Sequence, residues 1–148
     1  MERSLVLIKP DAMQRGLAGE IISRFEQRGL KIVAMKMLQM GRALAQRHYA
    51  AHEGKAFFDD LVNFITSSPV IAIVFQGKNA LEIIRQTMGE TNPAKARPGT
   101  IRGDLGLDIL HNLVHGSDSL ENATKEVNLF FAEKEIFDYH KDIDKWLS

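Results

Sequence analysis

The chain has 148 residues, of which 19 are basic and 19 are acidic, and it contains no cysteine. This length predicts a single domain over residues 1–148 that buries about two-thirds of its unfolded surface. Balanced charge excludes an overall field that would attract nucleic acid or an anionic membrane, and the missing cysteines exclude disulfides and thiolate zinc sites. No apolar run approaches the roughly 18 residues of a membrane span, and the N-terminus lacks a signal-peptide pattern, so we expect a soluble, cytoplasmic protein.

The first half of the chain predicts two strands and three helices, in the order strand, helix, strand, helix, helix. Short apolar runs that end at Pro or Gly indicate buried strands, and apolar residues three or four positions apart indicate helices. The strands are expected at residues 4–10 and 30–40, and the helices at 16–29, 43–51 and 55–68. In the last of these helices, Phe57, Leu61, Phe64 and Ile65 share one face, which predicts a stripe directed at the core.

The second half predicts the order strand, helix, strand, helix. The strands are expected at residues 70–76 and 108–115, and the helices at 79–89 and 119–131, the last with a stripe of Leu120, Ala123, Val127 and Phe130. Residues 90–106 form a Pro- and Gly-rich loop about as long as a compact domain carries without a functional cause. The complete order predicts an α/β (α+β) fold of the ferredoxin-like split βαβ type, a four-stranded antiparallel sheet with helices on one face.

Two common phosphate-binding motifs are absent. The stretch Gly77-Lys78-Asn79 resembles the end of a Walker motif, but the first glycine and the hydroxyl residue of that motif are missing. No G-x-G-x-x-G follows a predicted strand, which argues against a Rossmann site. A phosphate site in this chain therefore has to be built from side chains.

Two pairs of histidines four residues apart raise the question of a metal site. His48 and His52 lie on a predicted helix, but Tyr49 replaces the glutamate of the zinc-protease motif, and surface histidines are the simpler interpretation. His111 and His115 would share one face of a strand, yet no third ligand is evident. We therefore expect no metal held mainly by protein ligands.

Basic residues gather in and beside the Pro/Gly loop. The stretch 85–103 has a local net charge of +3, from Arg85, Lys95, Arg97 and Arg102 against Glu90. Guanidinium groups match the geometry and charge of phosphate oxygens, although a solvated loop with clustered arginines gives the same pattern. Lys9 adds a cation at the end of the first strand, where an unpaired buried ammonium would be unfavourable.

The sequence NLVHGSDS, residues 112–119, places a histidine where an apolar run meets a turn. A histidine in this position is often satisfied by a backbone carbonyl. Here Gly116 leaves one side of His115 clear, and the helix expected from Ser119 directs its positive end at the turn. Glu126, two helical turns further on, can accept a hydrogen bond from one ring nitrogen and leave the lone pair of the other exposed. The pattern predicts a nucleophilic histidine that becomes phosphorylated.

Three stretches, IKPDAMQRG, TNPAKARPGTIRGD and NLVHGSDS, resemble nucleoside diphosphate kinases in order and spacing, and the similarity runs from about Glu2 to Phe131. The resemblance implies the ferredoxin-like fold and a ping-pong transfer of the γ-phosphate from a nucleoside triphosphate, mainly ATP, to nucleoside diphosphates. It also implies Mg²⁺ carried by the nucleotide phosphates and a homo-oligomer, either a hexamer or a tetramer.

The resemblance also assigns roles to individual residues. His115 matches the phosphorylated nucleophile, Glu126 and Ser117 match its orienting pair, and Lys9 is both catalytic and nucleotide-binding. The implied nucleotide contacts are Lys9, Tyr49, Phe57, Arg85, Thr91, Arg102, Ile109 and Asn112. In the family the lysine and asparagine reach the ribose, the arginines and threonine hold phosphates, and the aromatic residue stacks on the base with an aliphatic residue on its other face.

All the implied contacts go to phosphate, ribose or the flat face of the base, which predicts broad base specificity. The departures from the family pattern are Leu105, Leu110 and His111, and they concern loop packing and assembly rather than chemistry. Pro93 falls in the loop that the family uses for subunit contacts. Two other functions fit the residues less well: a nucleotide-sensing scaffold on the same fold, and a metal-dependent hydrolase that uses the histidine pairs.

Overall fold

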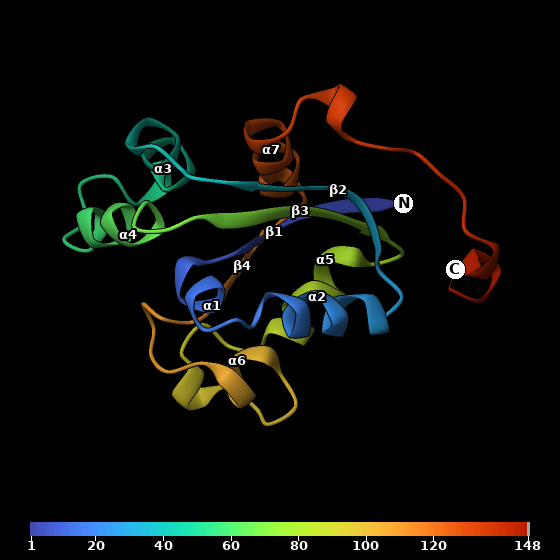
Figure 1. Ribbon diagram of the computed structural model, residues 1–148, viewed down its shortest axis with the longest axis horizontal. Coiled ribbons are helices and arrows are strands. Elements are labelled where there is room, and N and C mark those ends of the chain that lie inside the picture. The colour runs from blue at the N-terminus through green and yellow to red at the C-terminus, as the bar shows by residue number, and fades with distance from the viewer. Residues whose placement is uncertain (148) are drawn as a thin grey trace.

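The computed structural model describes residues 1–147, so Ser148, the last residue of the expected domain, lies outside the described part. Its centre is a four-stranded sheet with the strand order β2-β3-β1-β4 (Figure 1). The strands are β1 Glu2–Ile8, β2 Lys31–Leu38, β3 Val70–Gly77 and β4 Val114–Gly116. Every neighbouring pair is antiparallel, and in the pairing of β1 with β4 Leu7 lies opposite His115. The predicted four-stranded antiparallel sheet is confirmed.

Helices connect the strands and follow the last one. The α-helices are α1 Pro10–Gln14, α2 Ala18–Gln27, α3 Arg42–His48, α4 Phe58–Ile65, α5 Ala80–Met88, α6 Ile101–Leu105 and α7 Leu120–Phe130. Short 3-10 segments are Ala50–His52, Pro93–Lys95, Glu133–Glu135 and Asp142–Trp146. Pro10 ends the first strand as expected and also begins α1, because its fixed φ suits the first turn of a helix.

Helices cover both faces of the sheet, so the prediction of helices on one face is wrong. Figure 1 shows α7 on one side of the sheet and α2 and α5 on the other. The two faces carry separate hydrophobic clusters, one around Leu5 and Leu7 and one around Val6 and Ile8. Because successive strand residues point to opposite faces, the continuous apolar run in β1 requires cover on both sides.

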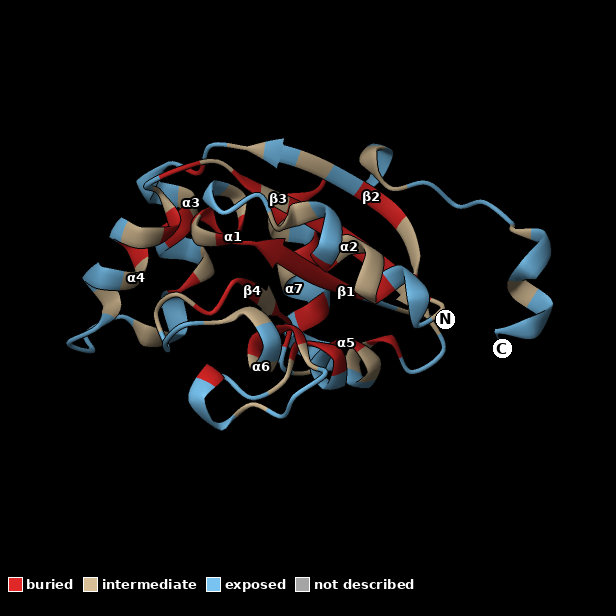
Figure 2. Ribbon diagram, turned by 60° about the horizontal axis from the view of Figure 1, so that its bottom comes forward, coloured by how far each residue is buried: buried red, intermediate tan, exposed pale blue. Residues whose placement is uncertain are grey.

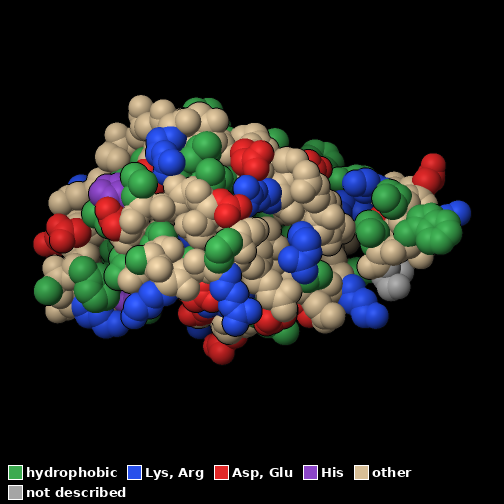
Figure 3. Space-filling view, turned by 90° about the horizontal axis from the view of Figure 1, so that it is seen from below, with side chains coloured by type: hydrophobic (Ala, Val, Ile, Leu, Met, Phe, Trp, Pro, Cys, Tyr) green, Lys and Arg blue, Asp and Glu red, His purple; other side chains and the backbone are tan. Residues whose placement is uncertain are grey.

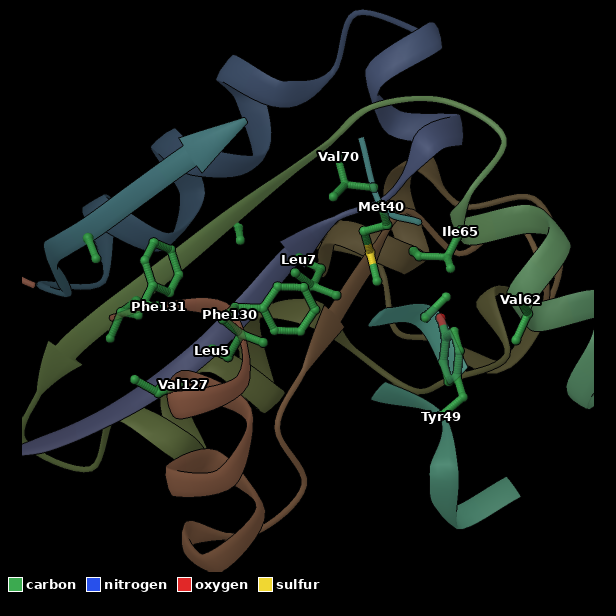
Figure 4. Packing of buried hydrophobic residues seen from close by; sticks show 14 of the residues in the cluster. Leu5, Leu7, Met40, Tyr49, Val62, Ile65, Val70, Val127, Phe130 and Phe131 are labelled. Carbon is green, nitrogen blue, oxygen red and sulfur yellow. The ribbon is translucent and has the colours of Figure 1, made fainter. Parts of the chain in front are cut away.

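The cluster on the α7 face supports the end of β1 that precedes Lys9, one of the predicted site residues. Figure 4 shows Leu5 and Leu7 of β1 against Val127 and Phe130 of α7, with Tyr49 at the end of α3 nearby. Figure 2 shows β1 buried along most of its length between the two helical layers. Close packing of this kind holds side chains in single rotamers, which fixes the position of groups attached to the strand ends.

The fourth strand is much shorter than predicted. Of the expected strand at residues 108–115, only the last two residues belong to β4, which ends at Gly116. Two features interrupt the strand: the Asp108 carboxylate accepts hydrogen bonds from the backbone N–H groups of Leu110 and His111, and Leu113 has a φ of 75°. A leucine in the left-handed region is unfavourable and redirects the chain, so the apolar pattern alone could not locate the strand.

Two predicted apolar stripes are partly wrong. Leu120 is 52% exposed at the start of α7, whereas the other three members of its stripe are buried. Phe57 is 46% exposed and stands just before α4, whose buried residues are Val62 and Ile65. Both misplaced residues lie in or beside a first helical turn: Leu120 is the first residue of α7, and Phe57 directly precedes α4. The loop at residues 90–106 also contains α6 and one 3-10 turn.

The surface shows mixed charge. Basic and acidic side chains are interspersed on the face seen in Figure 3, in keeping with equal numbers of both in the sequence. Within residues 1–147, no helix has the length and apolar character needed to cross a membrane.

Candidate active site

A cleft of about 890 Å³ opens beside β4 and the end of β1, bordered by α3, α4, α5 and α7. It brings together all but one of the predicted site residues. The predicted residues that line it are Lys9, Tyr49, Phe57, Arg85, Thr91, Arg102, Ile109, Asn112, His115 and Glu126. Another cavity, of about 660 Å³, lies between the C-terminal segment and the far end of the sheet and contains none of them. Segments more than a hundred residues apart thus converge on the first cleft.

His115 is fixed between β1 and α7. Its strand pairs with β1, and its Nε2 lies 2.9 Å from Oε2 and 3.1 Å from Oε1 of Glu126. The Ser117 hydroxyl, which is buried behind the cleft, donates to Oε1 of the same carboxylate at 2.5 Å. Because an anionic carboxylate can only accept, Nε2 carries the ring proton and the lone pair is on Nδ1.

The carboxylate of Glu126 is held in its charged form. Burial raises its pKa, but the hydrogen bond and charge of His115, the Ser117 hydroxyl and the nearby His48 together lower it below the usual value. Its helix, α7, is capped by Ser119, whose hydroxyl accepts a hydrogen bond from the backbone N–H of Asn122, as expected of an N-cap. The helix therefore presents a carboxylate to His115 at a fixed distance.

Lys9 is a buried cation at the end of β1. It is 7% exposed, and burial, followed by the charge of Arg102, lowers its pKa to about 8, while Asp11 acts in the opposite direction. Its Nζ donates to Oδ1 of Asn112 at 2.8 Å, and its backbone N–H donates to the carbonyl of Leu113 at 2.9 Å. Among residues 1–147 the ammonium therefore has a neutral partner and no ion pair within hydrogen-bonding distance, a state that favours an incoming anion.

The two predicted arginines differ in their surroundings. Arg85 is exposed on α5, whereas Arg102 is 7% exposed and donates to the backbone carbonyls of Gly89, Asn112 and Val114. Burial and the neighbouring Arg85 lower the Arg102 pKa to about 10, so it is charged at neutral pH. Lys95 and Arg97, which belong to the same basic stretch, do not line the cleft.

Two large apolar side chains stand exposed at the cleft. Phe57 is 46% and Ile109 60% exposed, and the Phe57 ring lies 5.2 Å from the ring of His52. Thr91 is also exposed, and its carbonyl accepts a hydrogen bond from Nδ2 of Asn112 at 3.0 Å. Large apolar groups left open beside cations are typical of a surface that receives a flat ring.

His48 is a site residue that the sequence reasoning missed. Its side chain is 0% exposed, so the interpretation as a surface histidine is wrong. Its ring stands edge-on to that of His115 with centroids 4.6 Å apart, and burial, followed by the charge of His115, lowers its pKa to about 3. The available signal was its spacing of four from Leu44 and three from Ala45, which places it on the core face of the predicted helix.

The second histidine pair does not form a shared site. His111 precedes β4 and hydrogen-bonds through Nδ1 to the Asp108 carboxylate at 3.0 Å, with its ring edge-on to Phe64. Of the residues that depart from the family pattern, Leu105 packs against the second core cluster and Leu110 lines the cleft. Arg47 and Asp118 also line the cleft and were not predicted.

The site combines an imidazole oriented by a carboxylate with buried and exposed cations, and it lies on an antiparallel sheet. This combination is typical of a nucleotide-binding phosphotransferase. The model of the family described as nucleoside diphosphate kinase matches residues 2–136. A nucleoside diphosphate kinase from Roseiflexus sp. (strain RS-1) is 58% identical over 147 residues, covering 99% of each chain. The chain belongs to the nucleoside diphosphate kinase family, which is a family of enzymes.

Solved structures agree with this assignment. A nucleoside diphosphate kinase family protein from Babesia bovis matches with a TM-score of 0.97 and 39% identity, covering 100% of both chains. A halophilic nucleoside diphosphate kinase from Halobacterium salinarum, solved in complex with CDP, matches with a TM-score of 0.95 and 49% identity, covering 98% of this chain and 97% of the other. The ferredoxin-like α/β fold is therefore shared over the full length.

Proposed function

We propose that this enzyme transfers the γ-phosphate of a nucleoside triphosphate, mainly ATP, to nucleoside diphosphates by a ping-pong mechanism through phosphohistidine at His115. The observation that carries the proposal is the bond between Nε2 of His115 and the Glu126 carboxylate, 2.9 Å long. It fixes the tautomer, so that the Nδ1 lone pair is free to attack. The ping-pong order follows because a phosphorylated histidine must release one diphosphate before it receives another.

The cations of the cleft support phosphoryl transfer. Lys9, Arg85 and Arg102 can spread charge away from the transferring group as the bond to the leaving oxygen breaks. Arg102 is held by backbone carbonyls, so little rearrangement is needed when phosphate arrives. A triphosphate held beside a fixed imidazole also turns a bimolecular encounter into a unimolecular step.

Mg²⁺ carried by the nucleotide is part of the proposal. The cleft lining contains two lysines, three arginines and three carboxylates, and one of these carboxylates, Glu126, is already engaged by His115 and Ser117. This donor set does not suit a cage of protein oxygens, but it fits an ion held mainly by phosphate oxygens, with Asp118 the exposed carboxylate beside β4. When bound, Mg²⁺ would neutralise phosphate charge.

Broad base specificity is supported by the kind of contact that the cleft offers. Phe57 and Ile109 present exposed apolar surface that can cover the face of any base. Neither side chain can hydrogen-bond a base edge, where strong discrimination would have to arise. The Halobacterium salinarum relative was solved with CDP, a pyrimidine nucleotide. We expect purine and pyrimidine diphosphates, ribo and deoxy, to serve as acceptors.

Assembly and location complete the proposal. A homo-oligomer, hexamer or tetramer, is supported by β2, an edge strand with Met35 and Met37 exposed at 53% and 63%, and by the 77% exposed Trp146 in the C-terminal segment. Sedimentation at micromolar concentration tests it, since a monomer would contradict it. A cytoplasmic location and the absence of nucleic-acid and membrane partners stay predictions.

The decisive experiment follows the phosphoryl group. The protein is incubated with γ-labelled ATP and Mg²⁺, and the label should appear on His115 as an acid-labile adduct and leave when GDP is added. His115→Asn should take up no label, whereas His140→Gln, at a histidine that is 77% exposed and does not line the cleft, should behave like the wild type. Label that stays on the protein after GDP addition would contradict the ping-pong mechanism.

A further inference from the structure

His48, His115 and Glu126 form a cluster in which one ligand atom from each residue lies within 4.8 Å of the others. Oε2 of Glu126 is 2.9 Å from Nε2 of His115 and 3.7 Å from Nδ1 of His48. In a tetrahedral site with metal–ligand distances of about 2.0–2.1 Å, neighbouring ligand atoms are about 3.3 Å apart. The two observed distances lie on either side of that value.

The proposed phosphotransfer mechanism assigns no role to the imidazole of His48. Both of its ring nitrogens are buried and lack a hydrogen-bond partner among the described residues. Burying a polar group without a hydrogen-bond partner is unfavourable, and the ring of His48 stands edge-on to the rings of Tyr49 and Phe130. A ligand that accepts a nitrogen lone pair at this position would account for the imidazole.

We propose that His48, His115 and Glu126 form a binding site for a transition-metal ion of the Zn²⁺ type, and that the bound ion reversibly blocks the phosphorylation of His115. Two imidazoles and one carboxylate suit Zn²⁺, whereas Mg²⁺ prefers oxygen ligands only. Three protein ligands leave a fourth position for water. His115 and Glu126 are 23% and 16% exposed and line the cleft, which gives the ion a path inward.

The block follows from the tautomer of His115 and therefore rests on the proposed function. With Glu126 as acceptor, the ring proton is on Nε2 and the lone pair on Nδ1. A metal ion on Nε2 takes the lone pair of that nitrogen, so the single proton of the neutral ring must move to Nδ1. The nitrogen that would attack phosphate is then protonated and has no lone pair to offer.

The metal site is tested by calorimetric titration of the nucleotide-free protein with Zn²⁺. We expect one equivalent per chain in the wild type and binding at least about tenfold weaker in His48→Gln, which loses one ligand. A double variant, His111→Gln with His140→Gln, removes two surface histidines that pair with carboxylates and should bind like the wild type. If His48→Gln does not fold, as judged by circular dichroism, Glu126→Gln serves as the ligand variant.

Visible absorption of the Co²⁺ complex provides a second measurement. A tetrahedral band that appears in the wild type and is lost in the ligand variant supports the site. Equal Zn²⁺ affinity in the wild type and the ligand variant would overturn it, as would loss of binding in the surface double variant.

The block is tested by phosphohistidine formation from Mg²⁺ and ATP with free Zn²⁺ set by a metal buffer. Half-inhibition should fall at the calorimetric Kd in the wild type and at a concentration at least about tenfold higher in His48→Gln, each relative to its own zinc-free rate. Undiminished labelling with the site saturated would overturn the block. If no protein is labelled even without zinc, the proposed function fails, while calorimetry still decides the metal site.

Discussion

The ammonium of Lys9 donates a 2.8 Å hydrogen bond to the side-chain oxygen of Asn112, 103 residues further along the chain. Nδ2 of the same amide donates to the carbonyl of Thr91 at 3.0 Å. One neutral side chain thus joins the end of β1 to the loop before β4 and satisfies a buried cation without neutralising it. The cation keeps its charge, and its burial without an opposite charge destabilises the nucleotide-free protein.

The stability of the nucleotide-free protein should rise with pH between about 8 and 10.5. Below this window Lys9 is charged in both the folded and unfolded states, and within it only the unfolded chain retains the proton, because folding lowers the pKa from 10.5 to about 8. The unfolded state then binds more protons, so the free energy of unfolding should increase by about 3 kcal/mol. Urea unfolding of the wild type and Lys9→Met measures the difference, and parallel profiles would contradict the prediction.

Substitutions of Arg102 and Arg85 should both reduce phosphotransfer, but only that of Arg102 should lower the stability of the fold. Arg102→Met removes a side-chain donor from three backbone carbonyls, of which that of Asn112 still accepts from the N–H of Val114. The change should lower the free energy of unfolding by about 2–4 kcal/mol and reduce kcat as well. Arg85→Met, at an exposed position, should change stability by less than about 0.5 kcal/mol while still reducing phosphotransfer. Equal destabilisation by both changes would show that the hydrogen bonds of Arg102 to the carbonyls of Gly89, Asn112 and Val114 do not stabilise the fold.

Glu126→Gln should reduce kcat about 10- to 100-fold with little change in KM. The amide keeps the shape of the carboxylate but lacks the charge that fixes the His115 tautomer and stabilises the imidazolium. Glu121→Gln is the matched control, since Glu121 lies on the same helix and its side chain is 80% exposed. A variant that raised KM while keeping kcat would indicate that Glu126 binds nucleotide rather than positions the nucleophile.

Phe57→Ala should weaken nucleotide binding while the fold stays intact. Phe57 is 46% exposed and outside the buried stripe of α4, so its loss should cost little stability, whereas a lost stacking contact is worth about 1–3 kcal/mol. Leu107→Ala, at a side chain that is 66% exposed and does not line the cleft, is the control. Calorimetric binding of ADP and thermal unfolding distinguish the cases, since core packing would lower Tm instead.

The relative kcat/KM for ADP, GDP, CDP, UDP and dTDP should spread over no more than about two orders of magnitude, because stacking differs little among bases. This outcome requires that no side chain hydrogen-bonds a base edge. A preference of about a thousandfold or more for one base would reveal such a contact and contradict broad specificity.

Much of the fold was predictable because its signals are local. Continuous apolar runs located β1 and β3, periodic apolar residues located α2, α5 and α7, and Ser119 was an expected helix cap. The contact between His115 and Glu126 was also predictable, because a turn after an apolar run and a carboxylate two helical turns later are both visible in the residues. Even the cover on both faces of β1 was signalled by its unbroken apolar run, although the prediction placed helices on one face only.

Only the tertiary structure decided the features that depend on contacts between distant segments. The length of β4 follows from Leu113, whose φ of 75° is imposed by its surroundings and not by its own preference. The burial of His48 against His115 depends on how α3 packs against the sheet. Of the basic residues at 95–102, Arg102 lines the cleft and Lys95 and Arg97 do not, which depends on the side chains that the folded loop directs inward. Sequence patterns report the average environment of a residue, whereas burial, hydrogen-bond partners and pKa are set by neighbours that the chain brings together only when it folds.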